Sequence, residues 1–580
     1  MNYINDYLGL NELKVFAFDT ETYGLEFDTI NLKDISFSDG TNSYYFDKDH
    51  LDIEKLKNVL INADLIIGHN LIFDLTVMSK FFGRSFLFEI NNVPLFDTML
   101  AQYILNENAK KGLKHLSETI LGYKMQTYEE SVNSLNKETW IKYSLEDSIQ
   151  TFKLYKYFKN KVNNNKVFKR ECKAILPIVD MQLEGFLVDK TKFKDIKEKM
   201  ENRLKEIEDE FISVFKKYGL KQNSLFGSII PINLNSPKQL KKFINNKLKI
   251  KIEDTSVKTL KNYKTKHKFF ELLLDYRHIY KLYNSYIKPF EEKHIQSDGK
   301  IHASFNPTGT VTGRYSSSSP NLQQIPSFDE FGMRELFIAD KGYKIACLDY
   351  AGQEIRLAAI ISNDRNMKDA LLNNKDIHLM TANSVYNLGI PSECLKTNHK
   401  DYKMYKDKFN AYRKKAKMVN FGVLYGAGAM GVSNLTGESE DKAQEMIDNF
   451  FEFYTGIKLK INKNSNYLYK YNEVINLFGR QRRFELIDSK AKRQSFNFLI
   501  QGTAGDMLKI DLYRVWNEVV LKYKDNIKLK ATVHDEIIFM IKENMIDEIL
   551  PQLVNIMQDF KFEIPIIVDY NVGNSYGSAH

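Results

Sequence analysis

Two adjacent carboxylates interrupt a run that otherwise has the composition of a buried β-strand, ATVHDEIIFMI at residues 531–541. An unpaired buried charge is very unfavourable, so Asp535 and Glu536 need either a turn that exposes them or a cation that offsets them. Taken alone, the triplet that begins at His534 favours a polar hairpin turn. Far upstream, the apolar run of YKIACLDYAGQEIRLAAIIS leads to another carboxylate, Asp349, at the mouth of a strand.

Further acids cluster in the N-terminal quarter. In LKVFAFDTETYGL an apolar strand over residues 13–18 leads into Asp19 and Glu21. Strand side chains alternate, so both carboxylates project to one face, where they repel unless a divalent cation lies between them. Alone, this triplet is weak support for a metal site.

Two later segments add polar pairs spaced by four residues. ADLIIGHNLIFDL carries Asn70 and Asp74, and WIKYSLEDSIQTFKLY carries Tyr143 and Asp147. If each segment is helical, the two members of a pair share one face of the helix.

A basic segment, FNAYRKKAKMVNFGVLYGAG, places Arg413, Lys417, Phe421 and Tyr425 four residues apart. Each step of four advances about 40° around a helix, so two cations and two rings form one slowly winding stripe. Aromatic stripes are most often core packing. Core packing does not explain the cations, which suit a triphosphate below a stacked base.

The remaining elements must position these groups. FNPTGTVTGRYSSSSPNLQQIP, residues 305–326, is rich in Gly, Ser, Thr, Asn and Pro, so we predict a long loop with Arg314 as a phosphate anchor. Composition alone favours a flexible linker. Residues 192–220 have helical periodicity with interleaved charges, which fits a solvated arm and a DNA-gripping arm equally well.

Composition bounds the class of protein. A chain of 580 residues is long enough for several domains. Residues 1–150 carry a net charge of −10 and the remainder +19, and this segregation favours a polyanionic partner for the larger part. The cysteines, Cys172, Cys347 and Cys394, form no CxxC pair. No apolar run is long enough to span a membrane, and we expect a soluble protein of the cytoplasm.

DTE, NxxxD and YxxxD, in this order, resemble the three motifs of the DEDDy 3'-5' exonucleases, which proofread beside many DNA polymerases. The resemblance implies that Asp19, Glu21, Asp74 and Asp147 hold two divalent ions and that Tyr143 orients the attacking water. Two metals clamp both the entering and the leaving oxygen of a phosphodiester displacement.

TGRYSSSSPNLQQIP, DYAGQEIR, RKKAKMVNFGVLYG and VHDEI resemble, in order, the template-primer segment and motifs A, B and C of the DNA polymerase I family, family A. GRQRRF and NFLIQGTAGD fill the expected gaps, and the resemblance covers essentially residues 170–580. It implies an α/β plus α+β multidomain chain, with an RNase H-like exonuclease domain followed by a right-hand polymerase. The expected bounds are 1–165 for the exonuclease, 166–580 for the polymerase, about 190–300 for the thumb, about 366–483 for the fingers, and about 166–189, 301–365 and 484–580 for the palm.

The same resemblance implies roles for individual residues. Asp349 and Asp535 would hold two Mg²⁺ ions, which Mn²⁺ can replace, with Asp535 presented at a hairpin tip, and Lys417 would protonate pyrophosphate as it leaves. The nucleotide-binding side chains would be Arg413, Lys417, Phe421, Tyr425, Glu354 and Tyr350, and Glu354 would crowd the 2' position. The DNA contacts would be Arg314, Asn497, Gln501 and His534. The role of Glu536 stays open.

Some features depart from the family pattern. Ala351, Gly352 and Gln353 replace the usual motif A residues, which puts detail around Glu354 in doubt, and Phe421 predicts poor acceptance of dideoxynucleotides. We expect no 5' nuclease domain and a replicative, phage-type monomer in a bacterial or phage-infected cell.

The expected ligands are primer-template DNA and dNTPs. Possible partners are a processivity factor, a helicase or a single-strand-binding protein. Two alternatives remain open: an exonuclease with a silent polymerase half, and a non-catalytic template-binding protein. The presence of Asp349, Lys417 and Asp535 argues against both.

Overall fold

The computed structural model describes residues 7–10, 12–133, 136–220, 231–327 and 329–580. The chain divides into two compact units. Unit 1 contains the chain up to Glu184, Ser304–Ser318 and Ala346–Asn571; unit 2 contains Gly185–Ala303, Ser319–Ile345 and Val572–His580.

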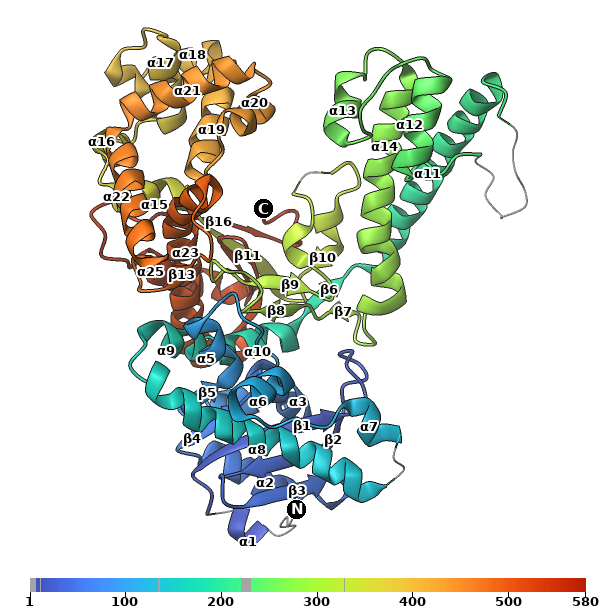
Figure 1. Ribbon diagram of the computed structural model, residues 1–580, viewed down its shortest axis with the longest axis vertical. Helices are drawn as coiled ribbons and strands as arrows, with labels where there is room; N and C mark the ends of the chain where they lie inside the picture. The colour runs from blue at the N-terminus through green and yellow to red at the C-terminus, as the bar shows by residue number, and fades with distance from the viewer. Residues whose placement is uncertain (1–6, 11, 134–135, 221–230, 328) are drawn as a thin grey trace. The chain divides into compact units, whose positions relative to one another are not determined.

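Unit 1 begins with a mixed five-stranded sheet, drawn in blue in Figure 1. Its strand order is β3-β2-β1-β4-β5; β1 is antiparallel to β2 and parallel to β4. The strands are β1 (Val15–Thr22), β2 (Leu32–Ser38), β3 (Ser43–Asp47), β4 (Leu65–Gly68) and β5 (Leu95–Asp97). The predicted strand therefore continues through Asp19 and Glu21, so the alternation that places them on one face is confirmed.

Helices cover this sheet. The longest, α8, packs on β1 and β2 and contains the predicted helical segment with Tyr143 and Asp147. Asn136 caps its first turn by accepting a hydrogen bond from the Glu138 amide. The helices are α2 (Ile53–Ile61), α3 (Leu71–Phe82), α4 (Ser85–Glu89), α5 (Thr98–Leu105), α6 (Leu113–Leu121), α7 (Tyr128–Asn133), α8 (Lys137–Val162), α9 (Lys166–Lys173) and α10 (Ile175–Glu184), with α1 (Tyr7–Leu10) before the sheet.

A second sheet in unit 1 has the strand order β14-β15-β11-β16. Its strands are β11 (Tyr343–Tyr350), β14 (Ile527–Val533), β15 (Glu536–Lys542) and β16 (Val568–Gly573). β14 and β15 form an antiparallel hairpin in which Val533 pairs with Glu536, so the predicted turn is confirmed but only His534 and Asp535 form its tip. Helices α15 (Gln353–Ser362), α23 (Ser489–Val515) and α25 (Ile546–Gln558) pack together beside this sheet.

A helical region of unit 1 lies between α15 and α23 in the sequence and is drawn in yellow and orange in Figure 1. The predicted basic stripe lies on α19, with Tyr425 one residue beyond its end. The helices are α16 (Arg365–Leu372), α17 (Ile377–Tyr386), α18 (Tyr402–Lys408), α19 (Asn410–Leu424), α20 (Ala429–Thr436), α21 (Glu440–Phe453) and α22 (Thr455–Tyr471), followed by strands β12 (Glu473–Ile475) and β13 (Gln481–Arg483).

Unit 2 contains the helices drawn in green in Figure 1 and a three-stranded sheet of order β10-β6-β7. The predicted long helix is confirmed as α11, which packs on α14. The elements are β6 (Phe186–Val188), α11 (Lys190–Lys217), α12 (Pro237–Asn246), α13 (Val257–Asn262), α14 (Lys268–Leu282), β7 (Lys300–Ile301) and β10 (Phe337–Ile338).

The segment 305–326, predicted as a loop throughout, contains a short hairpin in unit 1. Strands β8 (Ser304–Asn306) and β9 (Ser316–Ser318) pair antiparallel, and Arg314 lies in the turn region between them. The loop prediction is therefore wrong for the five paired residues that lie within this segment, 305–306 and 316–318. Among the described residues, no helix is both long and apolar enough to cross a membrane.

Candidate active sites

Three of the four predicted exonuclease carboxylates meet at one point of the N-terminal sheet. Oxygen atoms of Asp19 and Glu21, from β1, and of Asp147, from α8, all lie within 4.8 Å of one another. The strand supplies two ligands on one face, and the helix that crosses the strand supplies the third. Convergence of this kind gives a divalent cation several oxygen ligands at once.

The fourth carboxylate, Asp74, lies in the first turn of α3 and is 2% exposed. Its Oδ1 accepts hydrogen bonds from the Thr20 backbone N–H at 2.9 Å and from Thr20 Oγ1 at 2.7 Å. Asn70 precedes the helix in a left-handed conformation, so the predicted i, i+4 relation of these two residues does not hold within a helix. Thr20 lies between Asp19 and Glu21 on β1, and its two hydrogen bonds therefore hold Asp74 against that strand.

The four carboxylates hold their protons unusually tightly. Burial, and next the charge of Asp74, raise the pKa of Asp19 well above its usual range. Burial and then Asp147 raise the pKa of Glu21 to about 8. Burial, above all, raises the pKa of Asp74 and of Asp147 to about 7. Asp147 Oδ1 is buried and has no hydrogen-bond partner among the described residues. Carboxyl oxygens gathered in this way fit divalent cations, because a bound cation offsets the burial and the mutual repulsion that raise these pKa values.

Tyr143 lies one helical turn before Asp147 on α8 and is 7% exposed. Burial, followed by the charges of Glu21 and Asp147, raises the pKa of its phenol. Lys114 Nζ lies 4.9 Å from the centre of the ring. The hydroxyl is thus neutral beside the carboxylates and can donate a hydrogen bond there.

The second centre joins residues that are distant in the sequence. Asp349 is the last residue but one of β11, and Asp535 lies in the turn that precedes β15, the neighbouring strand of the sheet. Burial, followed by the charge of Asp535 and that of Glu536, raises the pKa of Asp349 to about 7. Burial also raises the pKa of Asp535. Two carboxyl groups close enough to perturb each other in this way suit a cation between them.

Glu354, 7% exposed in the first turn of α15, connects other predicted residues to this centre. Its Oε1 accepts a hydrogen bond from Arg314 Nη2 at 2.6 Å. Burial, followed by a hydrogen bond to Glu354, raises the pKa of Tyr425. The structure therefore brings Arg314, Glu354 and Tyr425 together.

The basic stripe of α19 is only partly free for a ligand. Arg413 Nε donates to Asp376 Oδ2 at 2.6 Å, and Tyr402 donates to the same oxygen at 2.8 Å. Lys417 is exposed. The Phe421 ring lies 5.9 Å from that of Tyr425, which is 45% exposed.

Tyr350, expected among the nucleotide-binding residues, has an enclosed side chain. It follows Asp349 on β11, so its side chain points to the opposite face of the strand. It is 1% exposed, and its hydroxyl donates to Asp511 Oδ2. The structure therefore leaves the backbone of Tyr350, rather than its side chain, for a contact with a nucleotide.

The remaining predicted DNA contacts are accessible. Asn497 and Gln501 are partly exposed and lie one turn apart on α23, so they share a face of that helix. His534 is exposed at the hairpin tip with a left-handed backbone, φ 58°. Glu536 is the first residue of β15 and is 4% exposed.

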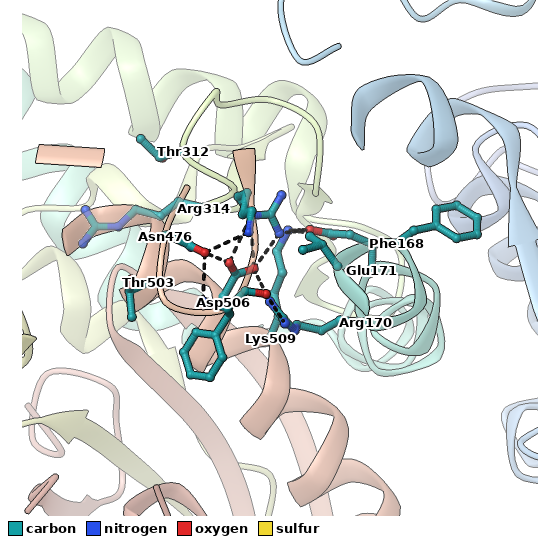
Figure 2. Close-up of polar contacts among 12 residues, drawn as sticks. Phe168, Arg170, Glu171, Thr312, Arg314, Asn476, Thr503, Asp506 and Lys509 are labelled. Atoms are coloured by element: carbon teal, nitrogen blue, oxygen red, sulfur yellow. Dashed lines mark hydrogen bonds and ion pairs between the residues drawn. The ribbon is translucent and has the colours of Figure 1, made fainter. Parts of the chain in front are cut away.

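Sequence reasoning missed a buried ion cluster beside Arg314, shown in Figure 2. Arg480 Nη2 donates to Asp506 Oδ1 at 2.7 Å and also pairs with Glu171. Lys509 Nζ donates to Glu171 Oε1 at 2.6 Å. No spacing rule links these positions, because α9, α23 and the β12–β13 hairpin supply them from distant parts of the chain.

Gly313 explains how the turn that carries Arg314 fits over this cluster. Its φ is +85°, and a Cβ atom at this position would lie 2.5 Å from Arg480 Nε. Only glycine allows both the left-handed conformation and this approach.

Comparisons with known proteins identify the families that match each part of the chain. A family model described as DNA polymerase family A matches residues 190–578, and one described as 3'-5' exonuclease matches residues 5–163. The DNA polymerase I of Borreliella burgdorferi is 29% identical to the chain, with 98% of the chain and 63% of the relative covered. That of Helicobacter pylori is 29% identical, with 86% and 54% covered. The chain thus spans about three fifths of these curated relatives or less.

A solved structure shares the fold. The POL domain of Pol1 from M. smegmatis, in complex with DNA primer-template and dNTP, has a TM-score of 0.82 at 20% identity, with 98% of the chain and 97% of the neighbour covered. The expected order of an exonuclease domain followed by a polymerase domain, in a mixed α and β fold, is confirmed.

Proposed function

The chain belongs to DNA polymerase family A, and from that premise we propose that it adds dNTPs to a primer 3'-OH under the direction of a template and removes 3'-terminal nucleotides with its N-terminal domain. The observation that carries the proposal is the approach of Asp349 and Asp535, which are 186 positions apart in sequence. One lies near the end of β11 and the other in the turn before the neighbouring strand β15, and burial, followed by the charge of Asp535, raises the pKa of Asp349. Two such acids at the ends of neighbouring strands are tolerated when both bind the same cation.

In the proposed synthesis reaction, Asp349 and Asp535 would hold two Mg²⁺ ions, for which Mn²⁺ could substitute. Ions held there would supply positive charge for activation of the primer hydroxyl and for the leaving pyrophosphate. The side chains orient the rest of the reaction. Lys417, exposed on α19, reaches the phosphates and gives a proton to the leaving group. Arg413 binds the phosphates after exchanging its Asp376 partner for them.

The sugar and the base of the nucleotide fit the other members of this site. Phe421 packs against the sugar, Tyr425 lies beside the nascent base pair, and Glu354 crowds the 2' position. Arg314, Asn497, Gln501 and His534 contact primer or template and read its shape rather than its sequence. The ion pair that Arg314 forms with Glu354 links the two sets of contacts.

In the proposed exonuclease reaction, Asp19, Glu21, Asp74 and Asp147 would hold two divalent ions, which would supply positive charge to the terminal phosphodiester. Tyr143 keeps its proton and orients the attacking water by donating a hydrogen bond. The raised pKa values of Glu21 and Asp74 support the binding of cations here, because four carboxylates this close together are tolerated only with protons or cations among them.

One assay separates this proposal from the alternatives. Primer extension is measured on a matched primer-template with the parent chain and with Asp535→Ala, and exonuclease activity on single-stranded DNA is measured for both. We expect extension to be lost and single-strand degradation to persist in the variant. A parent chain that degrades but never extends would support an exonuclease with a silent polymerase half. A parent chain that binds primer-template without either activity would support a template-binding protein.

The exonuclease assignment has its own control. Asp19→Ala combined with Glu21→Ala should abolish single-strand degradation and leave extension intact, and degradation that survives this change would refute the assignment. A replicative role, the phage-type origin, the expected domain bounds and accessory partners remain predictions of the sequence.

A further inference from the structure

Asp34 is a fifth carboxylate at the N-terminal centre. It lies on β2 directly opposite Glu21 in the antiparallel register, and it is 1% exposed. The motifs of the centre do not include it. A carboxylate buried beside four others adds repulsion, so its presence needs a compensating interaction.

The compensation comes from α8. Trp140 Nε1 donates to Asp34 Oδ2 at 2.7 Å, and Ser144 Oγ donates to Asp34 Oδ1 at 2.7 Å. A third link joins the same strand and helix, since Ser36 Oγ donates to the Ser144 carbonyl at 2.7 Å. Both carboxylate oxygens are therefore bonded to one helix. Lys33 Nζ, 3.1 Å from the centre of the Trp140 ring, adds positive charge.

The spacing of these donors connects them to the reacting groups. Trp140 and Ser144 form one i, i+4 row on α8, and Tyr143 and Asp147 form another. At about 100° per residue, the two rows lie about 60° apart around the helix axis. A rotation of α8 therefore cannot move one row without the other. Hydrogen bonds are directional, so two of them to a fixed carboxylate define that rotation better than apolar packing does.

We propose that Asp34 is a positioning residue that sets the rotation of α8, through Trp140 and Ser144, so that Asp147 and Tyr143 face Asp19 and Glu21. This inference rests on the proposed exonuclease function. Asp34 acts through the helix and touches neither substrate nor cation. Mutation of a partner that orients a metal ligand in this way typically lowers activity or metal affinity by about 10-fold to 100-fold.

The test removes the two donors and keeps the carboxylate. Trp140→Phe keeps an aromatic ring but lacks Nε1–H, and Ser144→Ala lacks the hydroxyl. Ser148→Ala is the matched control, because Ser148 is equally buried on α8 but donates only to the Leu145 carbonyl of its own helix. Each full-length variant is assayed for degradation of single-stranded DNA, for primer extension and for Mn²⁺ binding by electron paramagnetic resonance, with the binding of the Asp19→Ala/Glu21→Ala variant subtracted.

We expect Trp140→Phe combined with Ser144→Ala to lower exonuclease activity by about 10-fold or more and to weaken Mn²⁺ binding at this centre by a similar factor. Primer extension should stay within about twofold, because neither Trp140 nor Ser144 belongs to the polymerase centre, and Ser148→Ala should leave all three readouts within the same range. Trp140→Phe alone, which keeps an aromatic ring at this position, should show part of both losses and covers the case in which the double variant fails to fold.

The inference is overturned if exonuclease activity and Mn²⁺ binding of the Trp140→Phe and double variants stay at parental levels, or if Ser148→Ala loses as much as Ser144→Ala. A failure of the proposed exonuclease function is a different result: degradation would then survive in Asp19→Ala/Glu21→Ala itself.

Discussion

Asp74→Asn should stabilise the metal-free protein at alkaline pH while it disables the exonuclease. Burial raises the pKa of Asp74 to about 7, and the residue is 2% exposed. A carboxyl whose pKa is raised in the folded state prefers its neutral form there, so folding stability falls as the pH rises from the unfolded value of about 4 towards 7. Asparagine carries no charge and keeps an oxygen that can accept both hydrogen bonds from Thr20.

The magnitude follows from the size of the shift. About three pKa units at 1.4 kcal/mol each give an upper bound of about 4 kcal/mol above pH 7, and sharing of protons within the cluster reduces this, so we expect a gain of about 1–3 kcal/mol. Below about pH 4 the parent carboxyl is protonated in both states, and the gain should vanish.

The assay is denaturant unfolding of parent and Asp74→Asn in EDTA at pH 8 and at pH 4.5, followed by a repeat at pH 8 with Mg²⁺. Added Mg²⁺ should stabilise the parent more than the variant, because a ligand that binds the folded state stabilises it by an amount that grows with the logarithm of its concentration divided by Kd. The reasoning fails if the variant is no more stable than the parent in EDTA at pH 8, or if the same gain appears at both pH values.

Three further predictions concern the polymerase half. Gly313→Ala should cost about 3–5 kcal/mol of stability, measured by urea unfolding, because the new methyl group displaces Arg480 from its buried ion pairs; a loss below about 1 kcal/mol would mean that the turn relaxes freely. Phe421→Tyr should improve incorporation of dideoxynucleotides relative to dNTPs in a competitive extension assay, and an unchanged ratio would contradict the assigned contact with the sugar. Glu354→Ala should raise ribonucleotide incorporation by about 10-fold or more and should also weaken extension, since Arg314 loses its buried partner; unchanged sugar selectivity would refute the steric role of Glu354.

Much of each centre was predictable because the relevant rules are local. Alternation along a strand places Asp19 and Glu21 on one face, and the helical period places Tyr143 and Asp147 together. The conformation before Asp74 was not predictable, because the left-handed residue Asn70 replaces the expected helical turn. That centre therefore has the predicted ligands but a different backbone around one of them.

Tyr350 shows that a family resemblance does not by itself give the orientation of a side chain on its strand. The alternation that orients Asp349 towards the site also directs the next side chain away from it. Alternation along the strand therefore already predicts that the Tyr350 side chain points away from the site. Its partner Asp511 lies on α23, and no spacing rule connects the two. Motif membership identified the segment correctly, whereas the orientation of each side chain depended on the strand.

Asp34 marks the limit of prediction from one sequence. Its position opposite Glu21 depends on the register between β1 and β2, and a slip of one residue would turn the carboxylate to the other face of the sheet. Once the register is known, hydrogen bonds to Asp34 are expected, because a buried carboxylate beside other carboxylates needs donors. Helix α8 supplies two of them. Residues that bind ions can be recognised from their types and spacing, whereas residues that only orient those ligands become visible when tertiary pairing shows what they are bonded to.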